Sequence, residues 1–334
     1  MFLRNSWYVA AWDREVTRTP LARTLLGEPV VLYRAEDSKP AALEDRCCHR
    51  QLPLSMGKVE GDHLRCGYHG LKFDSSGRCV EIPGQAAIPP QARVRAYPLL
   101  EKYGWVWIWM GEPEKADPGL IPDWWWTEHR DWAFTRPDRV LVRCNYQLIS
   151  DNVLDVTHLA YVHASSIGAS SITEFPATVE RGERLVRLTR RIRDRPPPPL
   201  YQRAGGFPGN VERWQIVEHT PPCFTVNLAG CSDSKRKINL NALSAPTPET
   251  ETTTHYFFGF VRDFGVGDAE TEKVCAVDMV KVFNEDFPVL EAQQRGMEGS
   301  SSKIDIPTDA APLAARRMLE AMLAREATSS VPRA

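Results

Sequence analysis

The sequence predicts an α+β fold with two parts: a small N-terminal β domain with loops that carry Cys and His, and a larger domain of antiparallel sheet flanked by helices. Three observations support this prediction. Short apolar or alternating segments, interrupted by Gly and Pro, fill the first 110 or so residues. Residues 175–262 alternate between polar and apolar side chains, as strands with one buried face do. Two long uninterrupted segments, at about 269–295 and 309–326, have the pattern of helices.

The expected strands of the first domain include residues 6–12 and 29–36, a hairpin at 71–82 with DSSG at its turn, and a buried strand at 104–111. The segment at 112–123 is rich in Pro, Gly and Asp and is followed by three consecutive tryptophans, which marks a boundary. We therefore predict domains at residues 1–115 and 116–327 and a tail at 328–334.

In the second domain, strands are expected within 178–192, 212–230 and 237–261. The Pro-rich run at 195–199 and the Gly-rich run at 205–209 are expected to be loops, because neither can join a ladder of backbone hydrogen bonds. The final helix is expected to start near Asp309, with Pro312 in its first turn.

Composition excludes several classes of protein. The 334 residues carry a net charge of −2 and are 43% hydrophobic, so neither a nucleic acid nor a membrane is expected as a partner. The N-terminus lacks the apolar region of a signal peptide, and the most apolar run, at 105–110, is too short to span a bilayer. Most of the eight cysteines are scattered singly, which indicates reduced thiols and a cytoplasmic protein.

The strongest motif pairs Cys47-x-His49 with Cys66-x-x-His69 across sixteen intervening residues. Each loop supplies one thiolate and one imidazole. In a Rieske [2Fe–2S] cluster two cysteines bind one iron and two histidines bind the other, so this alternation favours such a cluster. The alternative is a Cys2His2 zinc site, although zinc fingers usually place like ligands together.

A second constellation lies at 150–164, where Asn152, Asp155 and His158 recur every third residue and would form one polar stripe on a helix. Apolar residues cover the other faces, so the stripe needs partners, and a metal is one of them. His163 follows five residues after His158, about 140° around an ideal helix. Both histidines can bind one metal only if the helix distorts or ends, for instance by a π-bulge or a break after Tyr161. Otherwise one histidine is a hydrogen-bonded core residue.

The stretch at 49–84, HRQLPLSMGKVEGDHLRCGYHGLKFDSSGRCVEIPG, resembles the Rieske non-haem iron oxygenases. Similarity to the vanillate and dicamba demethylase branch begins with FLRNSWYVAAW at 2–12 and runs through most of the chain. This resemblance implies a helix-grip-like catalytic domain and a mononuclear Fe(II) beside the Rieske cluster. One departure is Cys48, at a position where the family commonly has Pro; the C-x-H spacing favours Cys47 as the ligand.

The resemblance also implies roles in the second constellation, because N-x-x-D-x-x-H-x4-H is the family's mononuclear iron motif. His158 and His163 would be two ligands of a 2-His-1-carboxylate site. Asp155 would accept an imidazole N–H and link His158 to His69 of a neighbouring subunit, and Asn152 would lie near the iron.

The third ligand implied by the resemblance is Asp286. Its nearest competitor is Glu285, and Asp278 is a distant one. Pro288 departs from the family pattern and is expected to kink the helix just beyond Asp286 or to end a turn there. The four remaining histidines, of which His255 is the best candidate, have no partner at ligand spacing.

The function implied by the resemblance is that of a terminal oxygenase. It would use O2 and electrons from NAD(P)H, delivered by a separate ferredoxin or flavin reductase, to monooxygenate a small aromatic acid, with O-demethylation as the leading case. A homotrimer is implied, since electrons pass between neighbouring subunits in this family. The alternatives are ring or diaryl-ether dioxygenation, a Rieske electron-transfer ferredoxin, and a zinc-stabilised binding module. The pocket is expected between the sheet at 212–261 and its flanking helices, with no polar anchor assigned.

Overall fold

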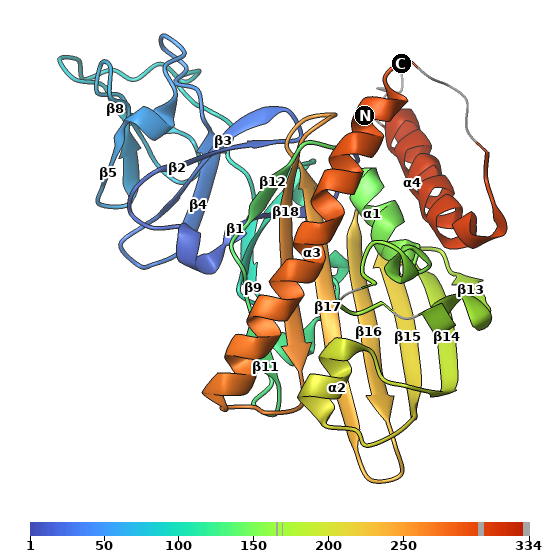
Figure 1. Cartoon of the computed structure of the whole chain (residues 1–334). Coiled ribbons are helices and arrows are strands. Elements are labelled where there is room, and N and C mark those ends of the chain that lie inside the picture. Colours follow the sequence, from blue (N-terminus) through green and yellow to red (C-terminus); the bar gives the residue numbers. More distant parts are fainter. Residues whose placement is uncertain (165, 169, 300–303, 330–334) are drawn as a thin grey trace. The chain divides into compact units, whose positions relative to one another are not determined.

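A computed structural model describes residues 1–164, 166–168, 170–299 and 304–329 (Figure 1). The chain forms two compact units. The first comprises Met1–Ile121 and Thr247–Glu251, and the second comprises Pro122–Pro246 and Thr252–Ala334. Each unit is described separately below.

The N-terminal unit consists of three small sheets with strand orders β1-β10-β9, β2-β3-β4 and β5-β6-β7-β8. Its strands are β1 (Trp7–Trp12), β2 (Leu21–Leu25), β3 (Glu28–Arg34), β4 (Pro40–Glu44), β5 (Lys58–Glu60), β6 (His63–Arg65), β7 (Lys72–Phe73), β8 (Cys79–Glu81), β9 (Leu99–Lys102) and β10 (Trp105–Trp109). The predicted hairpin at 71–82 is confirmed, because β7 and β8 pair in antiparallel fashion.

The Trp-rich run at 105–110 is a core strand. All five residues of β10 are buried, and β10 pairs with β1 so that Trp105 lies opposite Trp12 and Trp109 opposite Trp7. The rings of Trp12 and Trp105 stack at 4.9 Å, and aromatic cross-strand pairs of this kind stabilise a sheet beyond their buried area. None of the helices in the described part of the chain is long and apolar enough to cross a membrane.

The C-terminal unit is built on an antiparallel sheet with the order β11-β18-β17-β16-β15-β14-β13, and β12 also pairs with β18. Its strands are β11 (Ala133–Thr135), β12 (Val140–Val142), β13 (Ala177–Arg181), β14 (Val186–Arg195), β15 (Val211–Thr220), β16 (Phe224–Ser232), β17 (Lys237–Pro248) and β18 (Thr254–Arg262). Its helices are α1 (Tyr146–Leu154), α2 (Pro199–Gly205), α3 (Ala269–Met297) and α4 (Ala310–Ser329).

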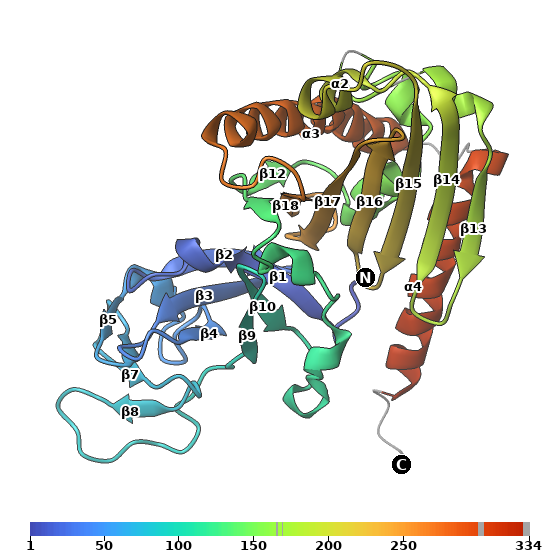
Figure 2. The same cartoon turned by 90° about the horizontal axis from the view of Figure 1, so that it is seen from below.

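The helices cover one face of this sheet. Helix α3 crosses it, with α1 and α2 on the same side, and α4 runs beside β13 and β14 (Figures 1 and 2). One core cluster joins α1, α2 and α3 to β15–β18, and a second joins α4 to β14 and β15. The predicted sheet flanked by helices is therefore confirmed.

Two details differ from the sequence analysis. The short helix α2 was not predicted; it begins at Pro199, the last residue of the expected proline loop, and ends at Gly205, the first residue of the expected glycine loop. Helix α3 continues through Pro288, so no turn ends there, and the kink expected at this proline stays a prediction. The tail predicted at 328–334 begins inside α4 and otherwise lies outside the described residues.

Candidate active site

The two ligand loops of the N-terminal unit have the same backbone closure. In each loop the cysteine N–H donates to the carbonyl five residues later, and the cysteine carbonyl accepts from the N–H four residues later. These bonds are Cys47 N to Leu52 O (2.9 Å), Gln51 N to Cys47 O (2.9 Å), Cys66 N to Leu71 O (2.8 Å) and Gly70 N to Cys66 O (3.2 Å). The fourth residue after each cysteine has a positive φ, which is 60° at Gln51 and 74° at Gly70. Glycine adopts this conformation readily, which accounts for Gly70.

The four predicted cluster ligands form two unlike ends. The thiols of Cys47 and Cys66 are buried and lie near each other, whereas the rings of His49 and His69 are exposed and their centroids lie 4.6 Å apart. Cys48 is exposed, which leaves Cys47 as the buried cysteine of the first loop.

The ligand atoms of these two loops do not gather at one point. In the described parts of the chain, the residues whose ligand atoms all lie within 4.8 Å of one another are His158, His163 and Asp286. A thiol end and a separate imidazole end therefore fit a two-iron cluster better than one tetrahedral zinc.

The second constellation is not one continuous helix. Asn145 caps the start of α1 by accepting from the N–H of Gln147, and the helix ends at Leu154. Asp155 leaves helical geometry with φ −92° and ψ 89°, and a short 3-10 turn follows at His158–Ala160. The break therefore falls before His158 rather than after Tyr161, and the predicted single stripe on one helix is wrong. The 3-10 turn that carries His158 then ends at Ala160, before His163, so the 140° separation of an ideal helix does not apply and both histidines can face the same point.

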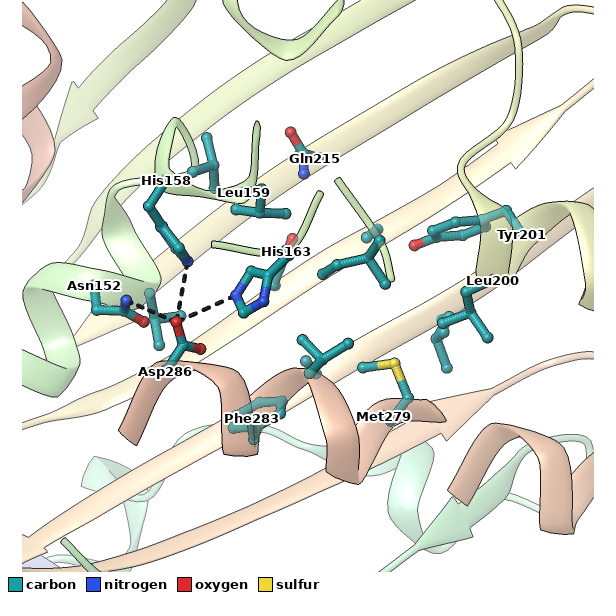
Figure 3. Close-up of a pocket in the computed structure, with 18 of the residues that line it drawn as sticks. Asn152, His158, Leu159, His163, Leu200, Tyr201, Gln215, Met279, Phe283 and Asp286 are labelled. Carbon is teal, nitrogen blue, oxygen red and sulfur yellow. Dashed lines mark hydrogen bonds and ion pairs between the residues drawn. The ribbon is translucent and has the colours of Figure 1, made fainter. Parts of the chain in front are cut away.

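His158 and His163 point toward Asp286 on α3 (Figure 3). The Nε2 atoms of the two rings lie 3.6 Å and 3.2 Å from Oδ1 of Asp286, and the ring centroids are 5.1 Å apart. Ligands that share one ion at bond lengths of about 2.1 Å are separated by roughly 3–3.5 Å, so the three atoms fit a single metal. Two imidazoles and one carboxylate are the donor set of non-haem Fe(II) oxygenases.

Each histidine is oriented through its other nitrogen. His158 Nδ1 contacts the backbone carbonyl of Asp155, and His163 Nδ1 lies 2.8 Å from Oε2 of Glu285. A hydrogen bond at Nδ1 selects the tautomer with a free Nε2 lone pair, which is the form that binds a metal.

Two expectations need correction. Within the chain, the carboxylate of Asp155 does not accept from His158: it accepts from the N–H and hydroxyl of Thr157. Glu285 is not an alternative to Asp286 but supports His163, and it also accepts from Ser166 at 2.8 Å. The more distant competitor, Asp278, pairs with Arg203.

Burial affects the two histidines differently. Burial lowers the pKa of His158 and outweighs the opposing charge of Asp286, so its ring is held neutral. Burial also disfavours a charged His163, but Asp286 and Glu285 outweigh it and raise the pKa of that ring. The acidic surroundings of His163 favour positive charge, whether that of a proton or of a metal ion.

Helix α3 also fixes the position of α1. Glu291 accepts from the N–H of Arg143 at 3.1 Å, and Gln294 accepts from the N–H of Asn145 at 2.9 Å. Near the other end of α1, Asn152 donates to Oδ1 of Asp286 at 3.1 Å. Asn152 therefore lies beside the candidate metal ligands, as predicted, and hydrogen-bonds to one of them.

A cavity of about 80 Å³ adjoins the three candidate ligands. It is several times larger than the roughly 15 Å³ that one water needs. Residues of α1, α2, α3 and β15–β17 line it. The sheet and its flanking helices were expected there, whereas α2 was not. Most of the lining residues are apolar; they include Val153, Leu159, Leu200, Leu240, Met279 and Phe283 (Figure 3). His255 does not line this cavity and lies 2.9 Å from Arg139.

Three polar residues of the cavity were not predicted: Arg213, Gln215 and Asn227. The sequence pattern could have revealed Arg213 and Gln215. On β15 they occupy the same alternating positions as the buried Val211 and Val217, so they point to the covered face of the sheet. Buried polar residues in an apolar register indicate a site.

Comparison with known proteins agrees with this geometry. The chain is 40% identical to the iron-sulfur subunit of the toluene-4-sulfonate monooxygenase system of Comamonas testosteroni, over 99% of this chain and 100% of that subunit. It is 35% identical to the vanillate O-demethylase oxygenase subunit of a Pseudomonas strain, over 98% and 96% of the two chains. A crystal structure of dicamba monooxygenase with non-heme iron and dicamba superposes with a TM-score of 0.84 at 32% identity, covering 98% of this chain and 99% of that one.

Two protein families match consecutive parts of the chain. Residues 6–98 match the Rieske [2Fe–2S] domain, and residues 142–325, more than half of the chain, match the vanillate O-demethylase oxygenase C-terminal domain. The first match contains the two cysteine–histidine loops, and the second contains the cavity with its two histidines and Asp286. The chain therefore belongs to the Rieske non-haem iron oxygenases, with a [2Fe–2S] domain followed by a catalytic domain that has a mononuclear iron site.

Proposed function

We propose that this chain is the terminal oxygenase of a multicomponent system that monooxygenates a small aromatic acid, with O-demethylation as the leading reaction. The observation that carries this proposal is the convergence of His158, His163 and Asp286 at the wall of a largely apolar cavity. The relatives named above act, by their names, on vanillate and toluene-4-sulfonate, which are both aromatic anions.

In this proposal Cys47, His49, Cys66 and His69 hold the Rieske cluster, and His158, His163 and Asp286 hold the mononuclear iron. When bound, the cluster relays single electrons and the iron supplies the oxidant from O2. The rest of the chemistry depends on how the protein places the substrate and excludes water.

The residues around the iron site have distinct tasks. Glu285 and the carbonyl of Asp155 fix the two imidazoles, and Asn152 holds Oδ1 of Asp286. The apolar wall, including Phe283 on α3, keeps the substrate carbon in a dry environment. A methoxy carbon hydroxylated there becomes a hemiacetal, which releases formaldehyde and leaves a phenol.

The partners follow from this division of labour. A separate ferredoxin or flavin reductase would deliver electrons from NAD(P)H, and the exposed rings of His49 and His69 suit electron exchange with it. In a homotrimer, the exposed His69 of one chain would meet Asp155 of another, whose carboxylate makes only local bonds to Thr157. A cytoplasmic location is proposed on the sequence evidence.

An oxygen-electrode screen of substituted aromatic acids with a surrogate reductase tests the proposal. Stoichiometric formaldehyde from a methoxybenzoate, with one O2 consumed per product, is the expected result. Formation of a cis-diol or cleavage of a diaryl ether would replace monooxygenation by dioxygenation. Absence of O2 uptake with every aromatic tested would contradict the proposal.

A further inference from the structure

One wall of the cavity contains a buried cation with no anionic partner. Arg213 on β15 is only 4% exposed, and its Nε and Nη1 atoms have no hydrogen-bond partner. Its Nη2 makes a single long contact, 3.5 Å, to the carbonyl of Ile167. A guanidinium remains protonated in proteins, so this positive charge is buried and unbalanced.

Among the described residues, no Asp or Glu side chain balances this charge. Every Asp and Glu of the sequence lies in the described residues, and none of them contacts Arg213. The neighbouring strand carries a second buried arginine, Arg190, whose charge is countered by Asp155 and opposed by Arg213. Arg213 therefore lies in a locally positive region that an anion would neutralise.

The surroundings of Arg213 place it away from the iron ligands. Its guanidinium lies 5.4 Å from the centre of the Tyr201 ring. Tyr201 directs its hydroxyl into the pocket from the side opposite His158 and Asp286 (Figure 3). Gln215 Oε1 and Asn227 Oδ1, which line the same cavity, also have no partner. The cavity thus has a metal end at His158 and Asp286 and a cationic end at Tyr201 and Arg213.

We propose that Arg213 is the residue that recognises the acidic head of the substrate, a carboxylate or a sulfonate on an aromatic ring. This inference rests on the proposed oxygenase function and adds the binding group and the orientation of the substrate. The planar fork of the guanidinium matches either oxyanion through paired N–H donors. With the head at Arg213, the opposite end of the ring, with its methyl or methoxy carbon, points toward His158, His163 and Asp286.

The test compares charged ligands with neutral analogues of the same shape. Calorimetric titration of the metal-loaded protein without oxygen measures the Kd of 4-methoxybenzoate, 4-methoxybenzamide, toluene-4-sulfonate and toluene-4-sulfonamide. The wild-type protein is expected to bind at least one anion more than about tenfold tighter than its amide, and the tighter anion identifies the head group. Equal binding of both amides and anions would overturn the proposal without any variant.

The decisive variant is Arg213→Met. We expect the Kd of the preferred anion to rise roughly 30- to 5,000-fold, the range found when one partner of a buried charged pair is truncated, while the neutral amide changes little. The matched control is Arg191→Met, because Arg191 is exposed on β14 and lies beside Trp214 on the opposite face of the sheet. If Arg213→Met fails to fold, Arg213→Gln is expected to show the same reversal of preference.

Unchanged anion binding in the folded Arg213 variant, or an equal loss in Arg191→Met, would overturn the assignment. Oxygen uptake measured with the same ligands separates this result from failure of the proposed function. Neutral methoxy compounds that still release formaldehyde in the variant would leave the oxygenase assignment intact. Anion binding that depends on Arg213 without any O2 uptake would instead confirm the anchor and contradict the proposed reaction.

Discussion

Glu285 and Asp286 are adjacent on α3 yet contact different atoms of the same histidine. Asp286 faces Nε2 of His163 at 3.2 Å, and Glu285 faces Nδ1 at 2.8 Å. The two carboxylates therefore approach opposite sides of one imidazole ring, one as a candidate metal ligand and one as the group that orients the ring.

Glu285→Gln should weaken the mononuclear site without removing it. An amide can still accept a hydrogen bond from His163, but it no longer supplies the charge that raises the basicity of the ring. We expect iron affinity at this site to fall roughly 10- to 100-fold, as for other outer partners of metal-binding histidines. Equilibrium titration with Fe(II) measures the change. Glu270→Gln, at an exposed position in the first turn of α3, is the control and should bind iron as the parent does.

His219 provides a pH prediction that is independent of the metals. It is 3% exposed on β15 and bonds to the Thr225 hydroxyl, and burial lowers its pKa to about 4. The unfolded chain, with a histidine pKa of about 6.5, takes up a proton first as the pH falls. This histidine therefore costs stability progressively from pH 6.5 down to about 4, and no further below that.

His219→Gln removes this proton uptake. Relative to the parent, the variant should gain roughly 2–3 kcal/mol between pH 7 and pH 4.5, since each pKa unit corresponds to about 1.4 kcal/mol. Urea unfolding at both pH values measures the difference. Parallel stability curves for the two proteins would show that His219 does not titrate in this range.

At the scale of elements, the end of α1 at Leu154 decides the geometry of the iron site. A five-residue spacing alone left open whether both histidines face one point, because an unbroken helix would separate them by about 140°. The position of α1 is set by tertiary contacts: α3 fixes both the start of α1 and Asn152 through side-chain hydrogen bonds. Such contacts come from residues more than 130 positions away, so local sequence could not reveal them.

Other elements were predictable because their pattern is local. The alternation on β14 and β15 and the long helices α3 and α4 follow from periodicity, and the two Cys–His loops follow from ligand spacing. Helix α2 was not predicted because it is only seven residues long and follows a proline run. The sequence could not reveal that Arg213 is buried without an acidic partner, because only the fold shows that none of the described Asp and Glu side chains reaches it.

The tie between α4 and α1 is a second element-scale prediction. Arg316 on α4 binds the carboxylate of Asp151, the residue before Asn152, through two donors, Nε and Nη2, at 2.5–3.1 Å. Arg316→Met should lower the free energy of unfolding by roughly 1–3 kcal/mol, the range for charge-assisted hydrogen bonds that are partly buried. Thermal or urea unfolding tests this. Arg317→Met is the control. Arg317 is the next residue of α4 and is exposed, so this substitution should leave the free energy of unfolding almost unchanged.

At the scale of the whole molecule, two matched families occupy successive parts of one chain and provide two kinds of iron site. The buried pair of thiols and the exposed pair of imidazoles suit electron relay. The site of two histidines and one carboxylate adjoins a largely apolar cavity. A protein with only one of these sites would not account for both sets of residues. An electron-transfer protein needs no second metal, and a zinc module would need no apolar cavity.

Metal analysis of the purified protein and of its His158→Ala and Asp286→Ala variants tests this central claim most directly. The parent should contain about three irons per chain and show a Rieske spectrum. Each variant should keep the Rieske spectrum, fall to about two irons and lose substrate-dependent O2 uptake. Variants that retain three irons and full uptake, or a parent with only two irons, would contradict the account.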